Sequence, residues 1–471
     1  SGSAATARIT GNADTAAIVG NGASIAVQNA ITVDSAVIST AGNDALANID
    51  ADSGGAISIA FMEAIASVDG AVTARMDGTV LGSGSVSVIA TGRNTADGNA
   101  ELLSVGLVGI GAGAANATIT DGADVEATVG GSVQTAGSLE VRALATNSAD
   151  ALSNVATGGI VGVSISKPLA SITGDTLAAL DPTSASTISG ASSITVTASS
   201  QQNANAYLDV KSLGLVGVSG GAPEASVTTA VTKATANGNV TILSPSAVVT
   251  IGSNVTSVVS SNASGKAFGG VAVNSVTPIA TSDVTSTAEM NGNVGSVTGS
   301  GATAVRTAGA NRLALSAGSD EWAVARVGGT AAGVVAVSAS TATATSSGDV
   351  NATLGGTAII TTNGIQVTAL AKTDADAFAD NTQGGAVSVN NLDTVSNVDP
   401  DVTVTINTTR LESLNADITI EARHGGEIVE LSDGTITAVS DGADTVSFAA
   451  PHGLRSGDVV IYEATSTTIN G

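Results

Sequence analysis

The chain has 471 residues, a formal net charge of −25, 57 glycines, no cysteine and only 1% aromatic residues. Ala, Val, Ile and Leu must then fill the interior, which favours a thin core repeated many times over one thick globular core. The acidic excess repels phosphate groups, so we expect no nucleic-acid partner. The longest uncharged apolar stretch, 104–119, is shorter than the roughly 20 residues that cross a bilayer, so we expect no membrane insertion.

A short strand pattern of alternating apolar residues recurs along the chain. Its first copy begins at Ile31. Constant spacing between such copies indicates structural units that stack on their neighbours. Later copies begin at Val86, Leu139, Ile194, Val249, Leu313, Ile365 and Ile418, and the successive intervals between these seven positions are 53, 55, 55, 64, 52 and 53.

A second element, a glycine followed by an apolar run, comes at a nearly constant offset after the start of each strand. In the first copy the offset from Ile31 to Gly55 is longer, which predicts a four-residue insertion. The run 160–163 is apolar at consecutive positions, so we expect a strand that is buried on both faces. The later glycines are Gly106, Gly159, Gly214, Gly270, Gly333 and Gly385.

A third strand begins soon after the second element, again at a similar offset in each copy. Three of its first four copies precede a Gly–Asp or Asp–Gly pair, at 69–70, 121–122 and 174–175. Such pairs favour turns, because Gly accepts positive φ and the Asp side chain bonds nearby backbone. The four copies begin at Ala66, Ala117, Ala170 and Ala225.

These patterns predict an all-β fold, a parallel β-helix (β-solenoid) of about seven or eight repeats of roughly 53–55 residues. With two or three coils per repeat, the stack would be a rod of about 70 to 100 Å. The alternative is a stack of antiparallel hairpin layers. We assign 1–30 to a partial repeat, 31–423 to the repeat array, and 424–471 to the start of a different module, cut short within a longer protein.

Two segments resemble a known class of protein. The segment 158–165, Gly-Gly-Ile-Val-Gly-Val-Ser-Ile, resembles repeats of the giant secreted surface proteins of Gram-negative bacteria, such as filamentous-haemagglutinin-like adhesins. The segment 451–462 looks like a His-Gly-Leu-x-x-Gly-Asp-x-Val-x-Tyr module found between repeat arrays in such proteins. The resemblance implies a secreted β-helical rod for adhesion or matrix building. It carries no catalytic residues over to this chain.

The chain offers little for catalysis. Its two histidines, His424 and His452, stand far apart in the sequence, and zinc sites need clusters of His or Cys. We therefore expect no enzyme activity, no catalytic residue and no cofactor. Alternating aspartates can gather oxygen ligands around Ca²⁺. The candidates for calcium are Asp374, Asp376, Asp399 and Asp401, with a solvated polar strand as the competing interpretation.

We expect a structural or adhesive segment of a secreted, cell-surface or matrix filament. Its expected partners are other copies or adjacent modules, joined end to end or laterally, and surface glycans or neighbouring cells. Trp322 and Arg326 form one unusual patch, for which partner contact and buried packing are both open. The alternative functions are a polysaccharide-active β-helix enzyme and a calcium-stiffened stalk.

Overall fold

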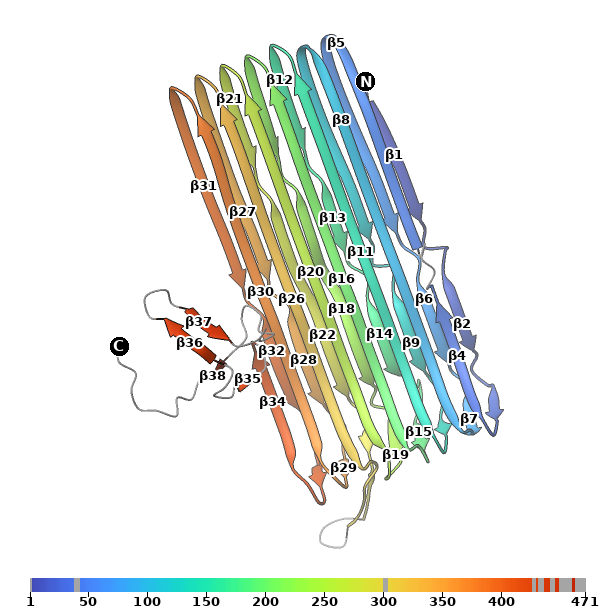
Figure 1. The fold of residues 1–471 in the computed structure, drawn as a ribbon. Helices are drawn as coiled ribbons and strands as arrows, with labels where there is room; N and C mark the ends of the chain where they lie inside the picture. The colour runs from blue at the N-terminus through green and yellow to red at the C-terminus, as the bar shows by residue number, and fades with distance from the viewer. Residues whose placement is uncertain are drawn as a thin grey trace.

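The computed structural model describes residues 2–37, 43–299 and 304–425, together with four short strands beyond them. Within these residues every regular element is a β-strand. Neighbouring strands of the main sheets pair in parallel, coil on coil, which confirms the parallel β-helix (Figure 1). The hairpin-layer alternative is wrong, because the described antiparallel pairs are confined to β24–β25 and β36–β37.

One repeat makes one coil. In the fourth coil β11 (Ser138–Gly158) ascends for 21 residues, and the chain then reverses. It descends through β12 (Val161–Ser166), β13 (Leu169–Ile172) and β14 (Thr176–Leu180), and it crosses the base in β15 (Ser186–Ser189). The ascending and descending legs form two long faces, and the base strands form a narrow third face (Figure 1). We call the opposite end, where the legs meet, the reversal end.

The same path is repeated throughout the described chain. The ascending strands are β4 (Ala30–Ala36), the first parts of β5 (Asn43–Val68) and β8 (Ser85–Ile119), β11, β16 (Ser193–Leu213), β20 (Val248–Phe268), β26 (Arg312–Ala332), β30 (Ile365–Gly384) and β34 (Ile418–His424). The descending strands are β1 (Gly2–Ile9), β2 (Thr15–Val19), the rest of β5 and β8, β6 (Val72–Met76), β9 (Val125–Val129), β12, β13, β14, β17 (Val216–Gly221), β18 (Glu224–Ala236), β21 (Val271–Val276), β22 (Ile279–Met290), β27 (Val335–Ser346), β28 (Asp349–Leu354), β31 (Val387–Val398) and β32 (Asp401–Ile406).

The base and the remaining strands complete the list. The eight base strands are β3 (Ser24–Ala26), β7 (Thr79–Gly82), β10 (Val133–Gln134), β15, β19 (Val240–Leu243), β23 (Asn293–Val294), β29 (Ile359–Thr361) and β33 (Leu411–Ser413). The others are β24 (Ser296–Thr298), β25 (Val305–Thr307), β35 (Val429–Glu430), β36 (Ile436–Ser440), β37 (Thr445–Phe448) and β38 (Val460–Ile461).

The expected count of two or three coils per repeat is wrong. Each leg is about 20 residues long, so one pass up and down uses nearly a whole repeat. Eight coils at about 4.8 Å give a stack of roughly 40 Å, whereas a 21-residue leg extends for about 70 Å. The described part is therefore a flat slab rather than a rod of 70 to 100 Å (Figure 1).

Residues that are one repeat apart in the sequence pair with each other in neighbouring coils. Leu139 pairs with Val86 on one side and with Ile194 on the other, as equivalent strand starts should. The longest interval, from Val249 to Leu313, contains the hairpin β24–β25. The hairpin is inserted within the base, between Val294 and Ala310, which both pair with β29. The four-residue insertion falls between Ala36, which pairs with Thr91, and Asn43, which pairs with Asn94.

The predicted domain boundaries can be placed on this path. Residues 2–26 form the descending leg and base strand of the first coil. The proposed boundary at 424 falls at the end of β34, which begins another ascending leg in register with β30. Apart from His424, Gly425 and the short strands β35 to β38, the expected module 424–471 lies outside the described residues, and so does His452.

Inward side chains change in size along the slab. The half near the base is filled by large aliphatic side chains such as Leu139, Ile194 and Ile251. The half toward the reversal end has a core made mostly of alanine. At the reversal end Thr157 Oγ1 and Ser164 Oγ, from the two legs of one coil, lie 2.9 Å apart. Two such short side chains touch only when their sheets are close, so the slab has almost no interior there.

Candidate functional site

The four predicted calcium ligands lie on two different legs of their coil. Asp374 and Asp376 are on the ascending strand β30, where the intervening Ala375 points into the core. Asp401 begins the descending strand β32, and Asp399 lies in the turn before it. Within the described ranges no group of three metal-ligating side chains occurs. The structure thus does not gather these residues into one site.

The Gly–Asp turns bind one coil to the next. Asp124 Oδ1 accepts a hydrogen bond of 2.9 Å from the backbone N–H of Asp175 in the following coil. Asp175 Oδ1 in turn accepts one of 2.8 Å from the N–H of Val231, and Asp14 does the same for Ala71. Burial raises the pKa of Asp124 to about 6. These aspartates therefore accept hydrogen bonds from backbone N–H groups at the points where the descending leg is interrupted.

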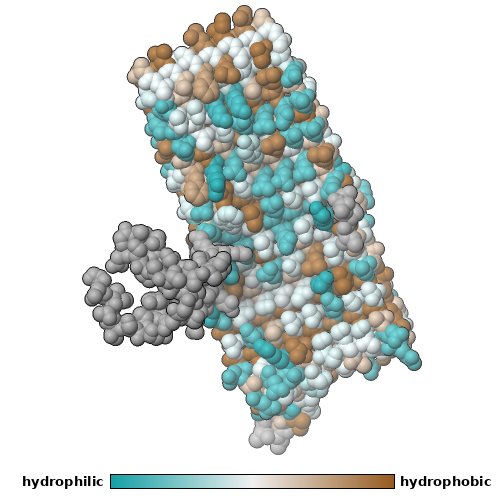
Figure 2. All heavy atoms as spheres, viewed as in Figure 1, coloured by the Kyte–Doolittle hydropathy of each residue, from teal (hydrophilic) through white to brown (hydrophobic). Residues whose placement is uncertain are grey.

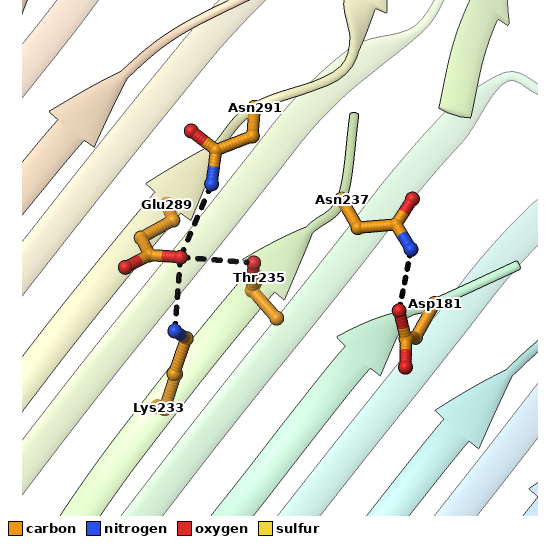
Figure 3. Close-up of polar contacts among 6 residues, drawn as sticks. All are labelled: Asp181, Lys233, Thr235, Asn237, Glu289 and Asn291. Carbon is orange, nitrogen blue, oxygen red and sulfur yellow. Dashed lines mark hydrogen bonds and ion pairs between the residues drawn. The ribbon is translucent and has the colours of Figure 1, made fainter. Parts of the chain in front are cut away.

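Polar contacts between coils continue toward the base on the descending face. Figure 3 shows Glu289 within reach of Lys233, whose Nζ lies 2.9 Å from Glu289 Oε2, and of Asn291, whose Nδ2 lies 3.2 Å from the same oxygen. Asn237 donates a hydrogen bond to Asp181 of the preceding coil. The pairs are exposed links between strands, and such ion pairs contribute little stability individually.

A ladder of buried polar side chains, which the sequence patterns had not predicted, divides the two apolar cores. Asn94 Nδ2 donates to Asn147 Oδ1 at 2.9 Å, and Asn147 Nδ2 donates to Gln202 Oε1 at 2.9 Å. Ser257 and Glu321 continue the same register position in the next two coils. The repeat spacing could have revealed this ladder. Its polar residues occupy the same position in successive repeats, whereas the neighbouring inward positions hold small apolar residues.

Glu321 is the one carboxylate deep in the described core, with 1% of its surface exposed. Ser282 Oγ donates to its Oε2 at 2.9 Å, while Oε1 has no hydrogen-bond partner among the described groups. Burial raises the pKa of Glu321 to about 7, and the negative charge of Asp283 acts in the same direction. Because its partners are the hydroxyls of Ser282 and Ser346 within the core, we regard Glu321 as a structural member of the ladder.

The aromatic patch and His424 lie on the surface. Trp322 is 43% exposed, and the guanidinium of Arg326 stacks over the ring of Phe378 in the next coil, 4.9 Å from its centroid. Both side chains therefore point outward. His424 Nε2 lies 2.7 Å from Thr373 Oγ1 on the neighbouring ascending strand.

The glycine-led apolar runs form the reversal end, and the expectation that they are buried on both faces is wrong. Their glycines and serines, such as Gly162 and Ser164, point inward, whereas Val161 and Val163 point outward. Large side chains cannot point inward where the sheets almost touch. The run in the sixth coil also begins one residue earlier than expected, because Gly269 rather than Gly270 occupies the position next to Gly214.

Two outward rows of aliphatic residues cross seven coils beside the reversal. We call these rows, with the flanking Phe61 and Ile165, the apolar face. One row consists of Ile57, Val108, Val161, Val216, Val271, Val335 and Val387. The other row consists of Ile59, Ile110, Val163, Val218, Val273, Val337 and Val389.

Further apolar side chains cap the reversal itself. Leu107, Ile160, Leu215 and Val334 are 59%, 53%, 65% and 65% exposed. Figure 2 shows hydrophobic residues gathered at this end of the slab. Monomeric soluble proteins rarely expose contiguous apolar patches of more than a few hundred Å². The reversal end is therefore the most unusual surface of the described chain.

Comparisons with protein-family models, with curated proteins and with solved structures find no match to this chain. The likeness to filamentous-haemagglutinin-like adhesins thus remains a prediction. In the described residues there is no helix long and apolar enough to cross a membrane.

Proposed function

We propose that the chain is a structural or adhesive segment of a secreted or cell-surface filament, and that it acts as a rigid, acidic, self-associating slab. The observation that carries this proposal is that its buried and half-buried polar side chains form hydrogen bonds from one coil to the next. Asp124, Asp175, Asn94 and Asn147 all form hydrogen bonds between coils. Asp124 and Asp175 also line a surface hollow with Lys233, and even there their carboxylates accept hydrogen bonds from the backbone of the following coil. Residues that would supply chemistry in an enzyme here connect neighbouring coils.

The parallel ladders give such a segment its rigidity. Each coil is bonded along both legs and the base to its neighbours, as when β11 pairs with β8 and with β16 over about 20 residues each. Stability in such a stack is a sum of coil and interface contributions, so coils at the ends can be added or lost singly. A filament of this kind lengthens by adding coils in the same register.

Single-molecule pulling from the two ends tests the proposal. We expect a series of unfolding steps, each releasing up to about 190 Å of chain, because a 53-residue coil extends at no more than ~3.6 Å per residue. Incubation with neutral and acidic glycans should give no turnover. Unfolding of the whole chain in one low-force event, or hydrolysis of any glycan, would contradict the proposal.

A further inference from the structure

The apolar face lies in a part of the chain that has no charge in any coil. Seven nine-residue windows cross the reversal end, at 54–62, 105–113, 158–166, 213–221, 268–276, 332–340 and 384–392. None of these windows includes Asp, Glu, Lys, Arg or His, although 12% of the whole chain is charged. The charges return just beyond the face, at Glu63 and Lys167. Composition alone would place several charges in the seven windows, so their absence is a property of this end of the slab.

The fold here is inverted relative to the rest of the slab. Near the base Leu139 and Ile194 point into the core and are fully buried. The residues that follow them, Glu140 and Thr195, are polar and point outward. Beside the reversal the interior holds Gly162 and Ser164, and the valines of the same strand face outward. The apolar surface that each coil contributes to this end therefore gains nothing from the protein's own core. It is left for a partner to bury.

Charge and area both favour a second copy as that partner. Two chains of net charge −25 repel each other, and an uncharged face allows them to approach without pairing like charges. The face spans seven strands spaced about 4.8 Å apart and three outward rows spaced about 7 Å apart, which gives an area of roughly 700 Å². This area is close to the ~800 Å² that each partner buries in a standard interface.

The third outward row supplies matching relief. Its large apolar side chains, Phe61 and Ile165, lie in the earlier coils, and small or polar residues follow. In order across the seven coils the row is Phe61, Ala112, Ile165, Gly220, Ser275, Ala339 and Asn391. A two-fold axis parallel to the strands and over the coil of Gly220 would set Ile165 of one copy against Ser275 of the other. Such an arrangement buries the same patch on both copies, as closed two-fold dimers require.

We propose that the apolar face pairs with the apolar face of a second copy, sheet against sheet. This inference rests on the proposed function and names the surface through which slabs associate laterally. Stacking of coils along the axis continues each slab, while pairing at the reversal end joins two slabs side by side.

Sedimentation equilibrium of the purified chain tests the pairing. Wild-type protein should form dimers at micromolar concentrations. The variant V161T/V163T/V216T/V218T keeps β-branched residues in the strands but removes apolar surface, and V163D/V218D adds charge to both copies. We expect the dissociation constant to rise at least tenfold in the first variant, and we expect the second to be monomeric.

Leu81→Asp and Val248→Asp are matched controls, because both side chains are exposed near the base, away from the face. They should dimerise like the wild type, and circular dichroism should show that all variants fold. A monomeric wild type at tens of micromolar, or equal dimerisation by all variants, would overturn the proposal. So would face-dependent binding to phosphatidylcholine vesicles by a monomeric wild type, which would identify a lipid partner. Because pulling measures the coil stack in a single chain, failed pairing is distinguishable from failure of the structural role.

Discussion

The position that a Cβ would take at Gly159 lies 2.0 Å from the carbonyl oxygen of Gly106 in the preceding coil. The same contact recurs from coil to coil: a Cβ at Gly269 would lie 2.1 Å from Gly214 O, and one at Gly333 would lie 2.3 Å from Gly269 O. The glycines that lead the apolar runs are therefore required by the close approach of backbones where the chain reverses.

Gly159→Ala should destabilise the fold, because the new methyl group meets the backbone oxygen of Gly106, which cannot move without disturbing the preceding coil. We expect a loss of about 1–3 kcal/mol, measured as a lower urea midpoint. Gly328→Ala is the control, since nothing lies within 4 Å of its Cβ position on β26. That variant should be slightly more stable, by roughly 0.5 kcal/mol. Equal midpoints for the two variants would contradict this account of the glycines.

Asn147→Ala tests the buried polar ladder. The change removes the acceptor that Asn94 Nδ2 reaches at 2.9 Å and the donor that Gln202 Oε1 receives at 2.9 Å. Loss of hydrogen bonds to buried groups should cost about 1–3 kcal/mol, seen again in the urea midpoint. Asn154→Ala, at an exposed position that bonds Glu101 at 3.3 Å, should change the midpoint little. An Asn147→Ala variant as stable as the wild type would mean that the ladder does not stabilise the stack.

Glu321→Gln should change how stability depends on pH. Because the pKa of Glu321 is raised from 4.5 to about 7, the folded state holds a proton that the unfolded state has released between these pH values. The wild type therefore loses stability as pH rises from about 4.5 to 7, by about 3 kcal/mol in total, and the penalty is constant above that range. The variant should match the wild type at pH 4 and exceed it at pH 8.

Urea midpoints of both proteins across this range measure the difference, which removes the contribution of the other carboxylates. Glu101→Gln, which changes an exposed residue, should follow the wild type at every pH. A constant difference between Glu321→Gln and wild type from pH 4 to pH 8 would show that folding does not change the pKa of Glu321.

The strand register was readable from the sequence, but the orientation of one strand was not. Leu139 and Ile194 could be paired in advance, because only a fixed spacing places equivalent residues in adjacent coils. The run 160–163 is apolar at consecutive positions, and such a run does not say which side of the strand faces the core. The distance between the two legs decided which side chains point inward, because only short side chains such as Thr157 and Ser164 fit between them. That distance depends on tertiary packing, which the sequence pattern does not reveal.

Other features were missed for equally physical reasons. The number of coils per repeat could not be predicted, because the sequence did not show that each leg runs straight for about 20 residues. It also did not show that the chain reverses sharply at the glycine between the two legs. Asn94, Asn147 and Gln202 could have been found by aligning the repeats, because they share one phase. Of the aspartates in the predicted turns, Asp175 bonds backbone, but that backbone belongs to the next coil rather than to its own turn. Asp69 instead accepts a hydrogen bond from the side chain of Thr120.

Removal of calcium should leave the stability of the chain unchanged. Asp374 and Asp376 lie on the ascending leg and Asp401 lies on the descending leg, and no group of three metal-ligating side chains exists in the part of the chain that the structure describes. Burial and the neighbouring charge of Asp376 raise the pKa of Asp374, so the two carboxylates repel each other. Thermal midpoints in chelator and in millimolar calcium should therefore coincide. Asp376→Asn should raise the midpoint slightly by relieving the repulsion. A midpoint that rises with calcium in the wild type but not in D374N/D376N would instead establish a calcium site on β30.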